Sequence, residues 1–288
     1  DSIIADNSAA SYGGGVASNG HSGTASVTLE NTTVSGNDAA YGGGLFNNGN
    51  GGHVTLELTG VPLSGNTATA GGGGLFNNGN GGIATAGLLN TTLSGNAAKI
   101  GGGVLNTGNG GEAGLSLVFT TIAANTATGG GGGLHLSPGA TVTVAASILA
   151  AGSQGKACGF TGGTSLISGG HNLDTDDSCD LGGPGDISGG NAGLLAPAVN
   201  APGSTATHAL EPGSDAQRKV PTGAVGCGTT ITADQRGATR PNPAPSCDIG
   251  AYESDAAAVI ATPSPTATGT PPSPSPTASG TPPSPTPT

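Results

Sequence analysis

The stretch Tyr41-Gly42-Gly43-Gly44-Leu45-Phe46-Asn47-Asn48 returns as Gly71-Gly72-Gly73-Gly74-Leu75-Phe76-Asn77-Asn78, and weaker copies occupy residues 12–19, 100–107 and 130–137. The aliphatic residue that follows the glycines marks each copy: Val16, Leu45, Leu75, Val104 and Leu134. Successive markers lie 29, 30, 29 and 30 residues apart. A fixed period of this length is typical of a chain that stacks one structural unit on the next. The repeat therefore predicts an elongated, stacked fold.

Aliphatic residues fill three further columns when the repeats are aligned. These columns are Val27, Leu56, Ala86, Leu115 and Val142; Leu29, Leu58, Leu88, Leu117 and Val144; and Val34, Leu63, Leu93, Ile122 and Leu149. The first two of these columns are two residues apart, which is the alternation of a strand with one buried face. Between them stand residues that we expect to face outward: Thr28, Glu57, Gly87, Ser116 and Thr143. The pattern predicts an all-β parallel solenoid with coils of about 29–30 residues and about three short strands in each.

One loop changes length along the repeats. The spacing between the first and last aliphatic columns is 18 residues in four repeats and 15 in the fifth. The shortening replaces a loop such as Asn48-Gly49-Asn50-Gly51-Gly52 with Ser137-Pro138-Gly139. Length changes of this kind occur in loops on the outside of a solenoid, so we expect an outer loop here.

Asparagine also recurs once per coil. One row is Asn37, Asn66, Asn96 and Asn125, and another is Asn47, Asn77 and Asn106. Asparagine tolerates left-handed turns, and stacked amides can form ladders of hydrogen bonds. We interpret the rows as structural. The functional alternative is glycan attachment, since Asn31-Thr32-Thr33 and Asn90-Thr91-Thr92 match the acceptor pattern.

The composition excludes several classes of partner. The 288 residues include 58 glycines but no Met and no Trp, only 8% are charged, and the formal net charge is -11. Lys99 is the only basic residue among the repeats, so they lack the basic surface that nucleic acid or an anionic membrane needs. The sequence contains no apolar run that approaches the ~18 residues of a membrane span. We expect a monomer, and an opening in mid-repeat suggests a processed chain or a fragment.

A second outward column carries the candidate binding residues. It reads Ala17, Phe46, Phe76, Leu105 and His135. An exposed row of aromatic and aliphatic side chains is a common mark of a binding surface. We therefore take Phe46, Phe76, Leu105 and His135 as binding candidates. The alternative is that a loop or the tail folds over them.

A row of threonines, Thr33, Thr92 and Thr121, resembles the hydroxyl rows with which some ice-binding solenoids meet ice. In the second coil Val61 and Pro62 break this row and the one beside it. Ice binding is therefore only a minor alternative.

The four cysteines follow the regular repeats. Cys158 and Cys179 are 21 residues apart, and Cys227 and Cys247 are 20 apart. Four cysteines allow three pairings, and we favour the sequence-adjacent one because each pair brackets a Gly-rich loop. The close Cys pairs of a zinc site are absent from the sequence. Disulfides imply an oxidising compartment, and therefore export.

Four carboxylates gather within seven residues at Asp174, Asp176, Asp177 and Asp180. Oxygen ligands at alternate positions could hold calcium, but the glycine and the bidentate Glu of an EF-hand loop are missing. We favour a solvated acidic turn and expect no metal or other cofactor.

The last third of the chain carries an ordered series of motifs. They are Leu194-Leu195-Ala196-Pro197, residues 207–216 (THALEPGSDA), Asp234-Gln235-Arg236-Gly237, Arg240-Pro241 and residues 247–253 (CDIGAYE). With these motifs, residues 1–253 resemble the choice-of-anchor Q family of bacterial right-handed parallel β-helix proteins. The Gly-rich coils also resemble the repeats of polymorphic outer-membrane proteins. The resemblance implies a secreted or cell-surface location and a variable C-terminal anchor, and it implies no defined activity.

His208, Asp234 and Arg236 are the candidate catalytic residues, because acid/base groups of this kind carry out hydrolysis. The alternative, which we favour, is a closing unit. In that unit an Asp234–Arg236 pair and a Cys227–Cys247 bridge would cover the apolar end of the last coil.

The chain divides into β-helix repeats at residues 1–155, irregular final coils and a C-terminal cap at 156–253, and a disordered Pro/Thr/Ser-rich stalk at 254–288. We expect a non-catalytic rod, adhesin-like, carbohydrate-binding or structural, that meets a glycan or another cell surface. The rival is a polysaccharide lyase or glycoside hydrolase. A hydrolase needs two carboxylates about 5–10 Å apart, whereas Glu30 and Glu57 are 27 residues apart and so occupy different columns.

Overall fold

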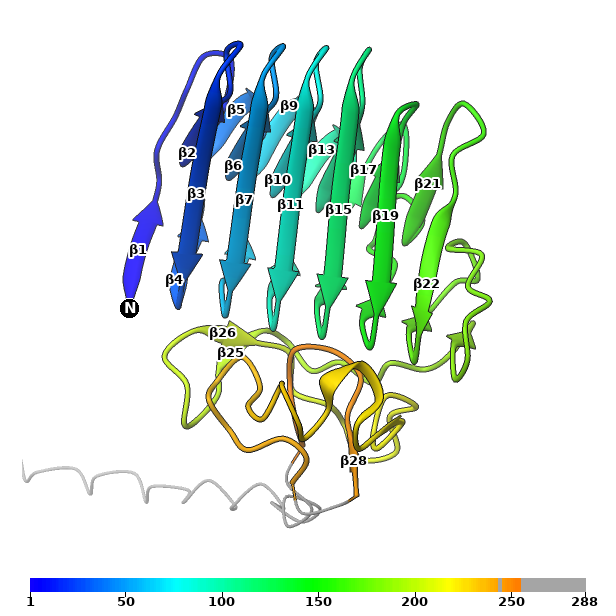
Figure 1. The fold of residues 1–288 in the computed structure, drawn as a ribbon. Helices are drawn as coiled ribbons and strands as arrows, with labels where there is room; N and C mark the ends of the chain where they lie inside the picture. Colours follow the sequence, from blue (N-terminus) through cyan, green and yellow to red (C-terminus); the bar gives the residue numbers. More distant parts are fainter. Residues whose placement is uncertain (243–244, 255–288) are drawn as a thin grey trace, which may run out of the picture.

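Parallel strands stacked coil upon coil form the body of the protein (Figure 1). The computed structural model describes residues 1–242 and 245–254. The strands of each coil pair in parallel with the equivalent strands of the coils before and after it, so the backbone bonds run along the solenoid axis. About six coils follow one another. The fold is the expected all-β parallel solenoid.

Three parallel sheets run the length of the solenoid, and a fourth, shorter one accompanies the middle coils. The eight-stranded flank sheet contains β1 (Ser2–Ala5), β4 (Thr32–Ser35), β8 (Leu63–Ser64), β12 (Thr92–Ser94), β16 (Thr121–Ala123), β20 (Ile148–Leu149), β23 (Leu173–Asp174) and β24 (Ile187–Ser188). The six-stranded marker sheet contains β2 (Val16–Asn19), β6 (Leu45–Asn48), β10 (Leu75–Asn78), β14 (Val104–Thr107), β18 (Leu134–Leu136) and β21 (Cys158–Phe160). The six-stranded long sheet contains β3 (Thr24–Glu30), β7 (His53–Thr59), β11 (Ile83–Leu89), β15 (Glu112–Val118), β19 (Ala140–Ala145) and β22 (Leu166–Gly170).

The fourth sheet adds a strand that the aliphatic pattern does not predict. It contains β5 (Asp38–Tyr41), β9 (Thr67–Gly71), β13 (Ala97–Ile100) and β17 (Thr126–Ala127). The buried residues of this small sheet are alanines, such as Ala39 and Ala68, which pair with each other. Alanine is too small to stand out as an apolar column, so the sequence indicates three strands per coil where the middle coils have four.

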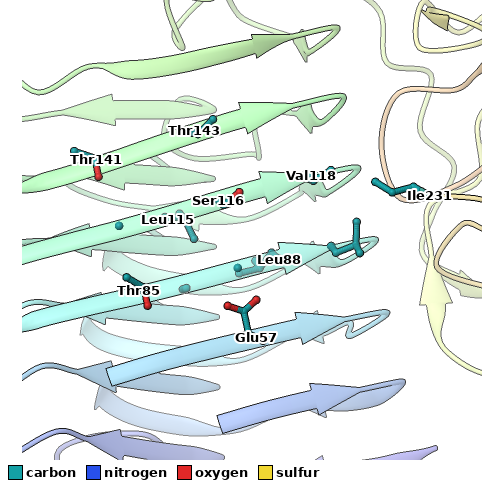
Figure 2. A pocket seen from close by; sticks show the side chains of 13 residues that line it. Glu57, Thr85, Leu88, Leu115, Ser116, Val118, Thr141, Thr143 and Ile231 are labelled. Carbon is teal, nitrogen blue, oxygen red and sulfur yellow. The ribbon is translucent and has the colours of Figure 1, made fainter. Parts of the chain in front are cut away.

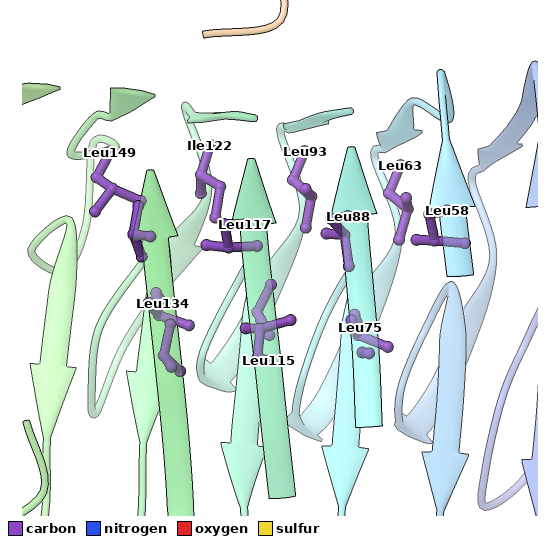
Figure 3. Packing of buried hydrophobic residues seen from close by; sticks show 14 of the residues in the cluster. Leu58, Leu63, Leu75, Leu88, Leu93, Leu115, Leu117, Ile122, Leu134 and Leu149 are labelled. Carbon is purple, nitrogen blue, oxygen red and sulfur yellow. The ribbon is translucent and has the colours of Figure 1, made fainter. Parts of the chain in front are cut away.

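The aliphatic columns fill the inside of the solenoid (Figure 3). Leu75 of the marker sheet, Leu88 of the long sheet and Leu93 of the flank sheet all belong to one buried cluster. Parallel register places each of these residues beside its equivalent in the next coil, as Leu88 lies beside Leu117. Burial of one such side chain stabilises the fold by about 1.5–3 kcal/mol. The aliphatic columns are therefore the core, as predicted.

Asparagine ladders hold successive coils in register. In the first ladder, each backbone N–H and each Nδ2 donates to the Oδ1 of the next member at 2.9–3.0 Å; the members are Asn7, Asn37, Asn66, Asn96 and Asn125. In the second, Asn47 Nδ2 donates to Asn77 and Asn77 Nδ2 donates to Asn106, both at 2.8 Å. The asparagine rows thus carry structural bonds between the coils.

Both sequence-adjacent disulfides are present. Cys158–Cys179 closes the last coils, and Cys227–Cys247 lies in the segment that follows them. We call this following segment, residues 191–242 and 245–254, the flank unit. It contains the antiparallel pairs β25 (Ala198–Val199) with β26 (Ala206–Thr207) and β27 (Val220–Pro221) with β28 (Ser246–Cys247), and the 3₁₀ turn Ala224–Gly226. The disulfides indicate an oxidising, exported environment.

The flank unit lies along the side of the solenoid, beneath the flank sheet, and not over the end of the last coil as expected (Figure 1). Its apolar residues pack on the outward residues Ala123, Ile148 and Leu173 of the flank sheet. These outward side chains are themselves apolar, so they would be exposed to water if the flank unit covered the end of the last coil. The placement therefore follows from the composition of the flank sheet.

The threonine row considered for ice binding also meets the flank unit. Thr92 Oγ1 donates to Gln235 Oε1 at 2.6 Å, and the N–H of Ala251 donates to Thr121 Oγ1 at 3.0 Å. Both of these threonines are buried, and Thr33, the other member of the row, is half-buried.

Within the described ranges, no helix has the length and apolarity needed to cross a bilayer. The expected stalk falls outside the described residues from position 255 onward.

Candidate functional site

The outer face of the long sheet is lined with small hydroxyl side chains. Two outward columns run in register across it: Ser26, Thr55, Thr85, Gly114 and Thr141, and Thr28, Glu57, Gly87, Ser116 and Thr143. The second column is the one expected to face outward, and Thr28, Glu57 and Ser116 are indeed exposed. Neighbouring residues of a column lie about 4.8 Å apart along the solenoid axis. The face is flat, polar and periodic.

An open groove of about 590 Å³ forms where this face approaches the flank unit (Figure 2). Its lining includes the hydroxyl residues Thr85, Ser116, Thr141 and Thr143 of the long sheet. Apolar atoms of Leu89 and Val118, and of Ile231 from the flank unit, also line it. Because these residues come from several successive coils, the groove extends along the axis and suits an extended ligand.

Glu57 is the carboxylate of the groove. A Cβ built on Gly87 would lie 2.2 Å from Glu57 Oε2, so the carboxylate occupies the space that a side chain at position 87 would fill. Glycine at this position therefore lets Glu57 lie along the groove floor.

Glu30 and Glu57 are closer than their columns suggest. On the paired strands β3 and β7, Thr28 lies opposite Glu57 and Glu30 lies opposite Thr59. The two glutamates are diagonal neighbours on one face, and the strand spacing and rise place their Cα atoms about 8 Å apart. The two glutamates occupy different columns, as predicted, but these columns are neighbours on the same outer face of the sheet. Both side chains are exposed to water, whereas an acid catalyst needs a carboxyl that a water-poor pocket keeps protonated.

The four binding candidates are buried, contrary to the exposed row that the sequence suggests. Phe46, Phe76, Leu105 and His135 are between 4% and 7% exposed. The ring of Tyr12 stacks on Phe46 at 4.7 Å between ring centroids. These residues point away from the core, but another layer of the chain, which includes strand β5, covers them in place of the loop or tail considered as the alternative.

The cover comes from the preceding coil. Tyr41 stacks on Phe76 at 5.4 Å between ring centroids, and it stands just before the glycine turn that begins at Gly42. Gly42 has a φ of +62°, a backbone conformation that favours glycine, and this turn folds the small sheet back over the marker sheet. Tyr12 and Tyr41, 52% and 37% exposed, therefore present the aromatic surface that the sequence assigns to the phenylalanines.

His135 has a structural role inside this layer. The N–H of Gly131 donates to His135 Nδ1 at 3.2 Å. Burial lowers the pKa of His135, which favours the neutral ring.

The structure joins two of the three catalytic candidates. Asp234 and Arg236 form the expected ion pair, with Nη2 at 2.7 Å and Nε at 2.8 Å from Oδ2. His208 lies elsewhere: its Nδ1 donates to the Leu195 carbonyl at 2.6 Å, and its Nε2 accepts from Ser94 Oγ at 2.8 Å. Burial lowers the pKa of His208, although the bond to Leu195 opposes this. These contacts fasten the flank unit and do not assemble a catalytic set.

The Asp234–Arg236 pair belongs to a larger buried cluster of charges. Arg240 lies 3.3 Å from Glu253, and Asp248 is buried beside them. Three carboxyls thus face two guanidinium groups. Burial raises the pKa of Glu253 to about 7, although the positive charge of Arg240 opposes the shift. A proton on Glu253 leaves the cluster neutral, which a buried site strongly favours.

The acidic turn uses its carboxylates as hydrogen-bond acceptors. Asp174 is buried and accepts from the N–H of Asp176 at 3.1 Å, while Asp176 accepts from Ser178 Oγ at 2.6 Å. Burial raises the pKa of Asp174. Hydrogen bonds, led by that from Ser178, lower the pKa of Asp176 although burial opposes them. Asp177 and Asp180 occupy left-handed turn positions.

In the portion of the chain that the structure describes, no group of three or more His, Cys, Asp or Glu side chains is placed to hold a metal ion.

The groove residues are the ones that sequence reasoning missed. Thr85, Ser116 and Thr143 carry a signal, since they are hydroxyl residues at outward positions of long strands. Ile231 carries none, because its approach depends on how the flank unit docks.

Comparison with known proteins adds no relative. No family model matches the chain, and no curated protein or solved structure matches it.

Proposed function

We propose that this protein is an exported, non-catalytic β-solenoid that binds a neutral glycan chain in the groove of the long sheet. The observation that carries the proposal is the groove lining. Hydroxyls of Thr85, Ser116 and Thr141 are placed to hydrogen-bond the polar edges of sugar rings, and Val118 and Ile231 are placed to pack on their apolar faces. A largely apolar hollow with a few polar groups is the usual form of a ligand site.

Charge favours a neutral ligand over an anionic one. Glu57 lies in the groove, and Lys99 is the only basic residue among the repeats. An anionic polymer would meet uncompensated negative charge, since the chain carries a formal net charge of -11. Neutral polysaccharide is therefore the ligand class that fits.

A cell-surface or secreted location supports the same proposal. The two disulfides fit an oxidising compartment. The resemblance of residues 1–253 to choice-of-anchor Q proteins, together with the Pro/Thr/Ser-rich sequence after residue 254, suits a rod displayed away from an envelope. Adhesion to a glycan-coated surface is the role we infer.

Glycan binding by two matched variants tests the site. Ser116→Arg places a long charged side chain inside the groove. Thr28→Arg places the same side chain in the same outward column but outside the groove lining. On an array of neutral and anionic polysaccharides, we expect Ser116→Arg to lose about tenfold or more in affinity, equivalent to about 1.4 kcal/mol, and Thr28→Arg to bind as the wild type does. Unchanged glycan affinity in Ser116→Arg would show that the groove is not the glycan-binding site.

A glycoside hydrolase is the second candidate, and the diagonal placement of Glu30 and Glu57 favours it. The two side chains leave neighbouring strands on the same face of the sheet, and a hydrolase needs two carboxyl groups about 5–10 Å apart. Turnover of the bound glycan distinguishes this candidate from the binding role.

A further inference from the structure

The outer loops of the middle coils contain chemically identical Asn-Gly turns. Asn50, Asn80 and Asn109 have φ values of 45°, 45° and 44°, and the glycine after each also has a positive φ. The three turns follow one another along the outer ridge of the solenoid. Any difference in reactivity between the three turns must therefore come from the coils beside them and not from the local sequence.

Bonds between coils hold the first two turns. The N–H of Gly51 donates to the Asn80 carbonyl at 3.1 Å, and the N–H of Gly81 donates to the Asn109 carbonyl at 3.2 Å. The side chains also form a ladder, since Asn80 Nδ2 donates to Asn50 Oδ1 at 3.3 Å and Asn109 Nδ2 donates to Asn80 Oδ1 at 3.4 Å. Each of these glycine amides is therefore engaged with the following coil.

The shortened fifth loop leaves the third turn open. The N–H of Gly108 donates to the Pro138 carbonyl at 2.9 Å, so residues 137–139 cross the ridge at the level of Gly108. Among the bonds of the described residues, the N–H of Gly110 has no acceptor and Asn109 Oδ1 has no donor. Asn109 is exposed, whereas Asn50 and Asn80 are partly buried.

We propose that Asn109 is a modification site, where the side-chain amide converts spontaneously to a carboxylate. The backbone nitrogen of Gly110 loses its proton to water or hydroxide and attacks Cγ of Asn109. A C–N bond forms, Nδ2 leaves as ammonia, and a cyclic imide results. Water then opens the imide at either carbonyl, which gives aspartate or isoaspartate with no change of oxidation state.

The coil-to-coil bonds explain why the reaction selects Asn109. The attacking amide must be free to deprotonate and to turn toward Cγ, and a hydrogen-bonded amide must first leave its acceptor. The remaining Asn-Gly pairs of the chain begin at Asn19, Asn48 and Asn78. Their glycine amides donate to carbonyls of the following coil at 2.8–2.9 Å. Among the Asn-Gly pairs of the described residues, Gly110 has the one glycine amide that need not leave a backbone acceptor before it reacts.

Peptide mapping of the folded, full-length chain tests the proposal. The chain is incubated at mildly alkaline pH, then digested and analysed by mass spectrometry for the amide-to-carboxylate mass gain at each Asn-Gly pair. We expect Asn109 to convert on the order of tenfold faster than Asn50 or Asn80, since at those two sites the N–H of the following glycine must first leave its acceptor carbonyl. In denaturant the three sites should convert at similar rates, because their local sequences match. Equal rates in the folded chain, or a slower rate at Asn109, would overturn the proposal.

A loop replacement tests the cause. Replacing residues 137–139 with the sequence of residues 107–112, Thr-Gly-Asn-Gly-Gly-Glu, extends the fifth loop to the length of the fourth. The longer loop should supply an acceptor for the Gly110 N–H and lower the rate at Asn109 to that at Asn80. A folded variant in which Asn109 still reacts as fast as in the wild type would contradict this mechanism. If the variant does not fold, the wild-type comparison of Asn109 with Asn80 decides the proposal.

Discussion

At the scale of single residues, buried amides hold one coil on the next, and the second ladder is incomplete at its N-terminal end. Asn47 donates to Asn77, but Asn47 Oδ1 is buried without a partner among the described residues. The residue opposite Asn47 in the preceding coil is Ser18, whose buried hydroxyl is also unpaired there. A buried polar atom without a partner costs about 1–3 kcal/mol.

Ser18→Asn should therefore stabilise the fold. The new Nδ2 would donate to Asn47 Oδ1 and extend the ladder by one member, which we expect to raise the free energy of unfolding by about 1 kcal/mol. Chemical denaturation of the two proteins measures the change, with Ser26→Asn on the exposed face of the long sheet as the control. An unchanged or lower stability in Ser18→Asn would show that the amide does not fit at this corner.

The sequence predicts the inward residues better than the outward ones. An aliphatic column such as Leu58, Leu88 and Leu117 must lie inside the solenoid, because exposure of such a row to water is unfavourable. Phe76 was correctly placed outside the core, but its burial depends on Tyr41, which reaches it through the glycine turn of the preceding coil. Strand alternation predicts whether a side chain points inward or outward, but it does not predict whether another part of the chain covers an outward side chain.

At the scale of elements, the flank unit is fastened by buried polar contacts. Asn90 Nδ2 donates to the carbonyl of Ala233, a residue 143 positions away, and the ring of Phe119 lies 4.2 Å from the Arg240 guanidinium carbon. Arg240 also donates to the carbonyls of Asp248 and Gly250. Contacts over such sequence separations leave no periodic signal, which is why the docking of this unit could not be predicted.

The Glu253 cluster predicts an uncommon dependence of stability on pH. The ordinary pKa of this carboxyl is 4.5, and burial raises it to about 7 in the folded chain. The folded state therefore binds the proton more tightly than the unfolded state does. Its contribution to stability is complete below pH 4.5 and is lost as the pH rises through about 7.

Glu253→Gln isolates this contribution, since glutamine keeps the shape of the protonated acid. As the pH rises from about 5 to about 8, the wild type should become less stable relative to the variant, by up to about 3 kcal/mol in the free energy of unfolding. Thermal unfolding of both proteins across this pH range measures the change as a growing difference in Tm. The lowered pKa values of His135 and His208 act the other way, with stability lost as the pH falls through 6.5, and they cancel in this comparison. A difference that is constant with pH would show that Glu253 is ionised throughout.

At the scale of the whole molecule, the sequence predicts the solenoid but not the groove. The period of 29 or 30 residues and the inward columns suffice for the fold, because each coil repeats the same side-chain positions. The groove needs a second partner, Ile231 of the flank unit, which lines it together with Ser116 of the long sheet. A site formed between a repeat and a non-repeating segment can therefore be recognised only in the three-dimensional structure.

We propose above all that the groove binds a glycan without cleaving it. The most direct test measures the release of reducing ends from the polysaccharide that the chain binds, with the wild type and Glu57→Gln side by side. We expect release no greater than in buffer alone for both proteins, while the wild type retains saturable binding. Release by the wild type that disappears in Glu57→Gln would contradict the claim and show that Glu57 takes part in hydrolysis.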